Sequence, residues 1–202
     1  TSANQHAVNS RIELACWLAL LVLANVGLMV GNGPSFALIF KPAAVAAGEW
    51  WRAVLAPLVH VSRYHLLVDG TAFLLLYAGL EEESRSRRLA WAIFAAAGSL
   101  LLPLAIAPEL NRIGLCGLSG AAHGLAAISA LEMLRQPQQK RFGAFLLAAL
   151  LLKCAWELWS GNVFLQNLHL GDIGQPIVST HAGGALGGLL GYGLTALLDR
   201  TN

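Results

Sequence analysis

Six long apolar stretches, separated by short polar segments, follow one another along the chain. They cover about residues 12–31, 63–80, 89–107, 113–134, 142–159 and 177–198. Each is close to the ~20 residues that a helix needs to cross ~30 Å of hydrocarbon. We therefore predict an all-α, polytopic membrane protein in which residues 11–202 form a single six-helix domain. The polar residues 1–10 are predicted to form a flexible N-terminal segment.

Basic residues gather in the segments on one side of this predicted bundle. Segments 81–88 and 135–141 carry three Lys or Arg residues each and Arg200 follows the last apolar stretch, whereas segment 160–178 carries none. Short loops rich in Lys and Arg are retained on the cytoplasmic side of a membrane. We expect both termini to be cytoplasmic, and segments 32–62, 108–112 and 160–178 to lie outside.

Composition excludes two broad classes of protein. Hydrophobic residues make up 56% of the chain and charged residues only 12%, with a mean hydropathy of +0.61, which leaves too little polar surface for a water-soluble domain of this length. The net charge of +2 is scattered, with no basic run to bind nucleic acid. The three cysteines, Cys16, Cys116 and Cys154, lie in or beside apolar stretches, so we expect small buried hydrophobes and no disulfide framework.

Polar groups lie at nearly equal depth in three of the six stretches. Counted from the charged residue that ends each stretch on the inside, Ser119, His65 and His181 all lie ~24–27 Å along a helix. Asp69 lies one turn deeper than His65 on the same helix face. Ionisable groups within a membrane are costly and mark functional sites. We expect these side chains to form one layer just below the outer interface.

Glycines in two of these stretches predict how close the helices approach. Gly117, Gly120 and Gly124 accompany Ser119, and the pattern Gly184-x-x-x-Gly188 follows His181. Small residues let membrane helices pack backbone to backbone. A serine that begins one such helix would then lie within reach of a histidine that begins the other, which is the arrangement of an activated nucleophile. Ser119 has a simpler reading as a small packing residue.

The chain resembles the rhomboid intramembrane serine proteases over essentially its whole length. The resemblance rests on the six-helix core and on four motifs in order: Trp51-Arg52, His60-x4-His65-x3-Asp69, Gly117-Leu118-Ser119-Gly120 and His181-x2-Gly184-x3-Gly188. It implies that Ser119 is the nucleophile and His181 its general base, as a dyad without an acidic third member. It also implies an oxyanion site made by backbone N–H groups around Ser119, including Gly117 and Leu118, and by the His65 side chain.

Two positions depart from the usual rhomboid pattern. Asp69 stands where an Asn oxyanion donor is usual, and a charged carboxylate there would repel the developing oxyanion, so we expect it to be protonated, paired with His65 or turned away. His123 stands where many rhomboids have a Tyr that packs against the catalytic histidine. It could stack on His181, relay its proton or pack in the core, and we favour a supporting role over that of the base.

The run Gly117-Leu118-Ser119-Gly120-x-x-His123-Gly124 is most similar to the rhombosortase branch. That resemblance implies substrates that are secreted bacterial proteins with a C-terminal sorting tail, made of a Gly-Gly motif, an apolar helix and a short basic end. It implies a location in the bacterial inner membrane among its lipids, with the active site open to the periplasm. No cofactor is implied, and no metal site is predicted, because the His65–Asp69 pair has no further ligands at a matching spacing.

Several other residues have local interpretations. Lys153 and Glu157 lie one turn apart and should neutralise each other, or alternatively tune a gate through which a substrate helix enters sideways. Arg52 is expected to hold the first outer segment by hydrogen bonds to backbone. His60 is read either as a donor that anchors a loop or as a neighbour of the oxyanion, and His169 is placed on the surface.

Two other functions stay open at this stage. One is a catalytically inactive rhomboid-like protein that binds membrane helices as a chaperone or adaptor. Ser119 and His181 argue against it, and the Asp69 substitution keeps it open. The other is a small channel or transporter that uses the His and Asp layer as a proton path. Such proteins usually show internal repeats, and the two halves of this sequence show no convincing repeat.

Overall fold

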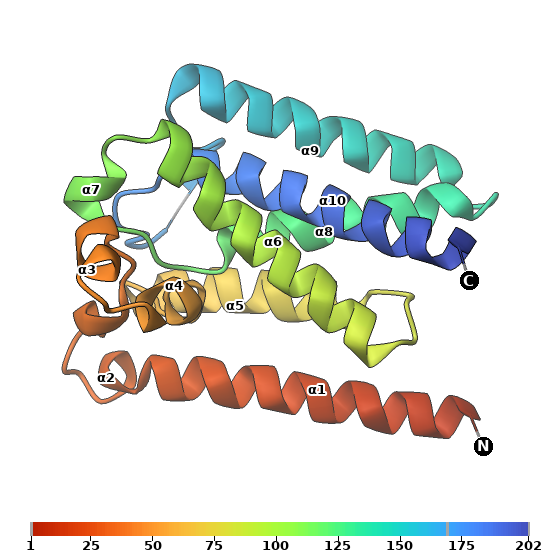
Figure 1. Ribbon diagram of the computed structural model, residues 1–202, viewed down its shortest axis with the longest axis horizontal. Coiled ribbons are helices and arrows are strands. Elements are labelled where there is room, and N and C mark those ends of the chain that lie inside the picture. The colour runs from red at the N-terminus through yellow and green to blue at the C-terminus, as the bar shows by residue number, and fades with distance from the viewer. Residues whose placement is uncertain (1, 169, 202) are drawn as a thin grey trace.

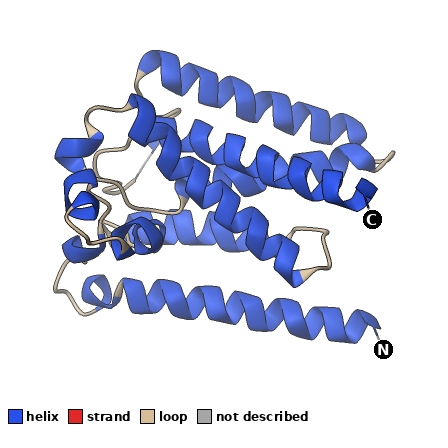
Figure 2. Cartoon of the chain, in the orientation of Figure 1, coloured by secondary structure: helices blue, strands red, loops and turns tan. Residues whose placement is uncertain are grey.

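The computed structural model describes the backbone of residues 2–168 and 170–201 and the side chains of residues 11–168 and 170–200, which leaves His169 outside the described residues. The described part is helical, apart from loops and one isolated bridge between Phe40 and Leu115 (Figure 2). The α-helices are α1 Ser2–Ala24, α2 Val26–Met29, α3 Pro42–Ala46, α4 Trp51–Leu55, α5 Arg63–Ala78, α6 Arg85–Ile106, α7 Leu110–Ile113, α8 Ser119–Arg135, α9 Lys140–Ser160 and α10 Ser179–Thr201. Short 3₁₀ turns occupy Phe36–Leu38, Ala56–Leu58 and Gln166–Leu168.

Helices α6, α8 and α10 pack against one another at the centre of the molecule. Helix α9 packs against α8 and α10, α5 packs against α8, and α1 lies beyond α5 (Figure 1). Both termini lie at one end of the bundle, and the short helices α2, α3, α4 and α7 lie at the other (Figure 1). The chain therefore passes along the bundle in alternating directions, as the six predicted stretches require.

Glycines bring α8 and α10 into backbone contact. A Cβ atom at Gly184 would overlap the carbonyl oxygen of Gly120, and a Cβ at Gly188 would overlap that of Gly124. Neither overlap can be relieved by turning a side chain, because the obstructing atoms belong to backbone. These glycines thus set the distance between the helix that begins at Ser119 and the helix that carries His181.

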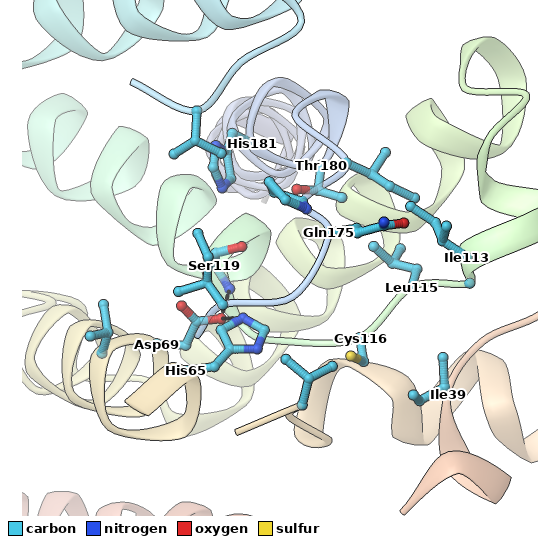
Figure 3. Close-up of a pocket in the computed structure, with 17 residues that line it drawn as sticks. Ile39, His65, Asp69, Ile113, Leu115, Cys116, Ser119, Gln175, Thr180 and His181 are labelled. Atoms are coloured by element: carbon cyan, nitrogen blue, oxygen red, sulfur yellow. Dashed lines mark hydrogen bonds and ion pairs between the residues drawn. The ribbon is translucent and has the colours of Figure 1, made fainter. Parts of the chain in front are cut away.

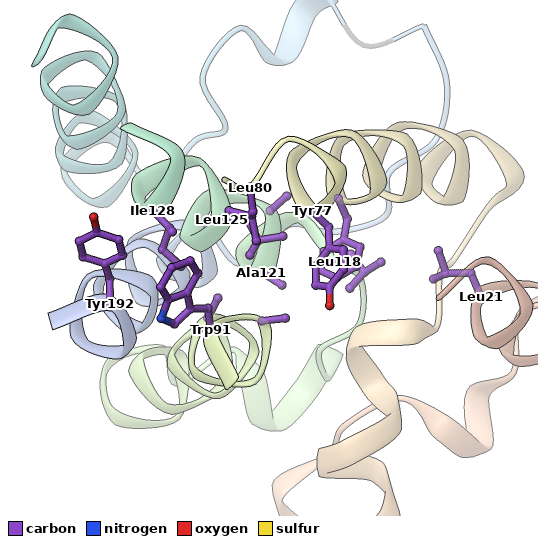
Figure 4. Packing of buried hydrophobic residues seen from close by; sticks show 13 residues of the cluster. Leu21, Tyr77, Leu80, Trp91, Leu118, Ala121, Leu125, Ile128 and Tyr192 are labelled. Carbon is purple, nitrogen blue, oxygen red and sulfur yellow. The ribbon is translucent and has the colours of Figure 1, made fainter. Parts of the chain in front are cut away.

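The main hydrophobic core surrounds α8. Leu125 and Ile128 of α8 are fully buried and pack with Phe73 and Tyr77 of α5 and Trp91 of α6 (Figure 4). Near the end that holds the termini, a buried ion pair joins α1 to α6, with Arg88 Nη2 2.9 Å from Glu13 Oε2. Burial of the apolar side chains fixes α5, α6 and α8 relative to one another.

Two of the described helices, α6 and α9, are long and apolar enough to cross a membrane. Helices α5 and α8 have 16 and 17 residues, shorter than the ~20 residues of a full crossing. Large apolar side chains such as Phe145 and Leu152 on α9 point outward and are exposed. The number of six crossings and the cytoplasmic placement of the termini stay predictions.

Element boundaries differ from the predicted stretches in three places. Helix α8 begins at Ser119 rather than near residue 113, because Gly114 and Gly117 adopt positive φ and end regular structure before it. The first stretch divides into α1 and α2 around Asn25, whose side-chain amide donates to the carbonyl of Leu58. Helix α1 already begins at Ser2, where we predicted a flexible segment, and residues 2–10 contain no Gly or Pro that would break a helix.

Candidate functional site

A cavity of about 320 Å³ opens at the end of the bundle that lies away from the termini. Ser119, His181, His65 and Asp69 all line it, so the structure brings together the side chains that depth along the sequence grouped in one layer. Figure 3 shows Ser119 at the start of α8, His181 on α10 on one side of it, and His65 with Asp69 on α5 on the other. Most of the rest of the wall is apolar, with side chains such as Ile39 and Ile113, and Gln175 and Thr180 add polar groups (Figure 3).

The backbone before Ser119 is held from two directions. Phe40 and Leu115 exchange a pair of backbone hydrogen bonds of 2.9 Å, and the Gly117 N–H donates to the carbonyl of Ala56 at 3.1 Å. Gly117 has a φ of +107°, and a Cβ there would lie 2.9 Å from Asp69 and from the His65 ring. Only glycine satisfies both the backbone angle and the space. Ser119 is consequently the first residue of α8, at the positive end of the helix dipole.

His65 and Asp69 are placed by the first turns of α5. The Ser62 hydroxyl caps this helix by accepting from the His65 N–H at 3.0 Å. Asp69 Oδ2 lies 3.0 Å from His65 Nε2 and also accepts from the Ser119 N–H at 3.0 Å. Of the three states expected for Asp69, the structure shows the carboxyl paired with His65 and directed at the nucleophile's own backbone.

His60 lies beneath this pair and is fully buried. Its backbone N–H donates to Asn25 Oδ1 at 2.8 Å, while neither ring nitrogen has a hydrogen-bond partner among the described residues, the nearest carboxylate being Asp69 at 3.7 Å. Burial lowers the pKa of His60 to about 4, against the opposing charge of Asp69. His60 is therefore a neutral neighbour of Asp69 whose backbone N–H anchors the loop to Asn25.

His181 lies in the first turn of α10, and its ring is held from behind by α9. His181 Nδ1 is 2.7 Å from Glu157 Oε2, and the side chain of Glu157 is fully buried. The polar contacts of the ring are made by Nδ1, and within the described part of the chain Nε2 has no hydrogen-bond partner. Catalytic hydrogen bonds are often long before substrate binds.

His123 stacks on the catalytic candidate His181, with ring centroids 4.0 Å apart and planes 10° from parallel. Its Nδ1 lies 2.6 Å from the carbonyl oxygen of Ser119, and its Nε2 lies 2.8 Å from Lys153 Nζ. Both ring nitrogens are thus occupied by groups other than the Ser119 hydroxyl. Of the roles considered for His123, this geometry fits stacking and support and leaves no nitrogen for the role of base.

Lys153 and Glu157 form the ion pair that their spacing predicts, at 2.7 Å. The sequence did not reveal their contacts with His123 and His181, which reach across from α9 to α8 and α10. Position along the apolar stretch could have indicated these contacts, because counting residues places Glu157 at the same depth as His181. An acidic residue at that depth has to find a partner in the same layer.

Three possible metal ligands meet here, although the sequence predicted none. One ligand atom each from His123, Glu157 and His181 lies within 4.8 Å of the others. The ammonium group of Lys153 lies 2.8 Å from His123 Nε2, 2.7 Å from Glu157 Oε1 and 3.3 Å from His181 Nδ1. The side chain of Lys153 thus supplies a positive charge at the point where these three groups converge.

Other predicted residues have structural places. Leu118 is buried in the main core, and Gly120 lies against α10 and α6. Arg52 donates from Nη1 to the carbonyls of Phe36 and Ile39, which confirms that it holds segment 32–62 by hydrogen bonds to backbone. The prediction of buried cysteines is confirmed for Cys154 alone: Cys16 on α1 is exposed, and Cys116 is half-buried and lines the cavity. An apolar position in a helix can face the surroundings of the bundle or a cavity as well as the core.

Comparison with known proteins gives one match. The Rhomboid domain matches residues 47–197, which is more than half of the chain and includes all the cavity residues discussed above except Ile39. The curated proteins and the solved structures yield no match. The matched range carries Ser119, His181 and the glycines that set the distance between their helices. The chain belongs to the rhomboid family, which generally comprises intramembrane serine proteases.

Proposed function

We propose that the protein is an intramembrane serine endopeptidase in which Ser119 is the nucleophile and His181 the general base. One observation carries this proposal. Ser119 and His181 line the same cavity from the first turns of two helices in backbone contact, and Nε2 of His181 is left without another partner. A serine next to an oriented base is the arrangement that nucleophilic catalysis requires.

In the proposed reaction, the Ser119 hydroxyl attacks the scissile carbonyl carbon while His181 Nε2 takes its proton. The tetrahedral intermediate expels the amine, which receives that proton from Nε2, and the acyl group stays on Ser119. Water then attacks the acyl-enzyme with the same histidine as base, which releases the carboxylate and restores the hydroxyl. An acceptor other than water, such as a lipid amine, would use the same acyl-enzyme.

The oxyanion would be held by the Ser119 N–H, by neighbouring backbone at the start of α8 and by His65. In this structure both the Ser119 N–H and His65 Nε2 contact Asp69 Oδ2. The Asp69 carboxyl therefore occupies the position that a substrate oxyanion needs, and the proposed mechanism requires it to move aside or to be neutralised when substrate binds.

We further propose that the substrates are secreted bacterial proteins with a C-terminal Gly-Gly motif, an apolar helix and a basic tail, cut near the periplasmic face of the inner membrane. The similarity to rhombosortases in segment 117–124 supports this assignment. The basic segments 81–88 and 135–141 support the orientation, because they lie at the opposite end of the bundle from the cavity. A basic tail on the substrate would be retained on the same cytoplasmic side.

A reconstituted cleavage assay tests both levels of this proposal. The purified protein would be placed in liposomes with a reporter that carries the Gly-Gly motif, an apolar helix and a basic tail. We expect Ser119→Ala and His181→Ala to abolish cleavage, while Ser99→Ala retains it. Ser99 is a useful control because it is a nearby serine that is buried rather than exposed to the cavity, and its hydroxyl donates to the Ala96 carbonyl at 2.7 Å.

The outcomes separate the activity from its specificity. Cleavage that persists in Ser119→Ala contradicts the proposal that the protein is a serine endopeptidase with Ser119 as its nucleophile. Cleavage that depends on Ser119 and His181 but is equal for reporters with Gly-Gly and with Val-Val contradicts the rhombosortase assignment and leaves the endopeptidase. A folded wild-type protein that binds the reporter without cutting it would support the inactive, helix-binding alternative.

A further inference from the structure

We propose that Glu157 is a positioning residue that holds His181 as a base, so that the site works as a Ser-His-Glu triad. This inference rests on the proposed function of Ser119 and His181. It adds a third, acidic member from α9 to the two residues that the resemblance assigns, and it gives Lys153 and His123 defined places in the same network.

The first step is the proton on His181. An ionised carboxylate can only accept hydrogen bonds, so at 2.7 Å from Glu157 Oε2 the Nδ1 atom of His181 must be the donor. The proton is then on Nδ1, and Nε2 carries the lone pair. Nε2 is the nitrogen without another partner, and the ring lies beside Ser119 at the cavity wall (Figure 3). The carboxylate thus selects the tautomer that can take a proton from the Ser119 hydroxyl.

The second step is the charge on Glu157. Its other oxygen, Oε1, accepts from Lys153 Nζ at 2.7 Å and from the Phe164 N–H at 2.9 Å. Three donors therefore surround this fully buried side chain. An ionised carboxylate can accept all three hydrogen bonds, whereas a protonated carboxyl would direct its own O–H at one of the donors. Lys153 stays close to His181 Nδ1, at 3.3 Å, but two donors cannot bond to each other, so its hydrogen bonds go to Glu157 and His123.

The third step is His123, which closes the network. Its Nε2 faces the Lys153 ammonium and must be the acceptor, so its Nδ1 carries the proton and donates to the Ser119 carbonyl at 2.6 Å. The His123 ring is also stacked on His181. A continuous chain of hydrogen bonds therefore runs from the backbone of Ser119 through His123, Lys153 and Glu157 to the imidazole of His181. Rotation of the His181 ring would break both the bond to Glu157 and the stacking.

This geometry makes Glu157→Gln a sharp test. The Gln side chain has one acceptor oxygen and one NH₂ donor, and the Oε1 position faces two donors, Lys153 and Phe164. The amide oxygen must occupy that position, which turns the NH₂ group toward His181 Nδ1. His181 would then accept at Nδ1 and carry its proton on Nε2, where it can no longer serve as the base.

The experiment combines a spectroscopic and a chemical readout on the whole chain in detergent. Nitrogen NMR of protein labelled with ¹⁵N-histidine reports the tautomer of each ring, and His181→Ala assigns the signal. We expect an Nδ1–H tautomer in the wild type and an Nε2–H tautomer in Glu157→Gln. Labelling of Ser119 by a fluorophosphonate should slow by on the order of 10³-fold or more in Glu157→Gln.

Glu132→Gln is the matched control. Glu132 is a buried glutamate of α8 that accepts from the backbone N–H groups of Glu81 and Glu82, at the end of the bundle away from the cavity. We expect it to leave both the His181 tautomer and the labelling rate unchanged. A loss of labelling in Glu132→Gln equal to that in Glu157→Gln would show that the loss is a general effect of removing a buried charge.

The tautomer also separates failure of this inference from failure of the proposed function. An Nε2–H tautomer in the wild type, or a tautomer that Glu157→Gln does not change, overturns the triad even if Ser119 is labelled normally. Conversely, the wild type could show the expected His181 tautomer and yet remain unlabelled at Ser119. That result would support the positioning of His181 by Glu157 and contradict the proposed protease activity.

Discussion

At the scale of single residues, Asp69 competes with the substrate for a hydrogen-bond donor. Its Oδ2 atom accepts from the Ser119 N–H at 3.0 Å and lies 3.0 Å from His65 Nε2, which are the two groups proposed to hold the oxyanion. A carboxylate is itself an oxyanion, so without substrate the proposed oxyanion site is occupied by the Asp69 side chain. The negative charge opposes the reaction unless it moves or is neutralised.

The first prediction concerns this competition. Asp69→Asn removes the charge while keeping the shape, and it restores the residue that is usual in rhomboids. We expect the rate of Ser119 labelling by a fluorophosphonate at neutral pH to rise several-fold, because an amide donates to an oxyanion where a carboxylate repels it. A tenfold or greater loss of labelling in folded Asp69→Asn would instead show that the carboxylate is needed to hold His65.

The residues of the site differ in how far sequence could predict them. Ser119, His181 and His65 could be grouped because their depth follows from counting along helices. The Lys153–Glu157 pair is local, with a spacing of one turn, and was equally accessible. The contact between Glu157 and His181 joins two helices whose rotation about their own axes the sequence does not specify, so only the structure reveals it.

At the scale of helices, the seam between α8 and α10 sets the distance between nucleophile and base. Gly120 and Gly124 face Gly184 and Gly188 along this seam, and no side chain separates the two backbones there. The glycine pattern predicted a close approach of these helices but not which glycines oppose each other. That register depends on where α8 begins, which the turns at Gly114 and Gly117 determine.

The second prediction tests the seam with two substitutions in one helix. In Gly184→Ala the new Cβ would overlap the Gly120 carbonyl, so α8 and α10 must separate, and we expect a loss of about 1–3 kcal/mol in stability together with reduced labelling of Ser119. Gly193→Ala is the control, because a Cβ at Gly193 meets nothing within 4 Å, and it should be neutral or stabilise α10 by up to about 1 kcal/mol.

Thermal unfolding in detergent measures the difference between these two variants. The proposed role of the seam would be contradicted if Gly184→Ala matched Gly193→Ala both in unfolding temperature and in the rate of Ser119 labelling. Equal unfolding with unequal labelling would show instead that the glycines matter to the site and not to the stability of the bundle.

At the scale of the whole molecule, the proposed active site and several charged side-chain pairs lie toward opposite ends of the bundle. The cavity lies at the end of the bundle away from the termini, while charged pairs join helices toward the other end, including Arg88 with Glu13 and Arg87 Nη1 with Asp199 Oδ2 at 2.8 Å. The alternation of apolar and basic segments predicted that the basic residues and the candidate site would lie at different ends of the bundle. It could not predict the cavity, because the cavity is lined by residues 113–116, whose backbone position depends on long-range hydrogen bonds of Leu115 with Phe40 and of Gly117 with Ala56.

The overall architecture was predictable in outline because each apolar stretch is long and its ends are charged. The all-helical fold and the membership in the rhomboid family follow that outline. Short helices α3, α4 and α7 were not predicted, since segments of four or five residues have too little periodicity to be recognised. Of these three helices, α7 reaches the cavity through Ile113, and most of the remaining wall comes from loops and from the ends of α5, α8 and α10.

The most direct test of the central claim is fluorophosphonate labelling of the purified, folded protein, followed by mass spectrometry to locate the modified residue. We predict a single modification, on Ser119, in the wild type, and none in His181→Ala, because the hydroxyl becomes nucleophilic only when Nε2 of His181 can accept its proton. Modification at another residue, or a folded wild-type protein that the probe leaves unmodified, would contradict the assignment of Ser119 as the activated nucleophile.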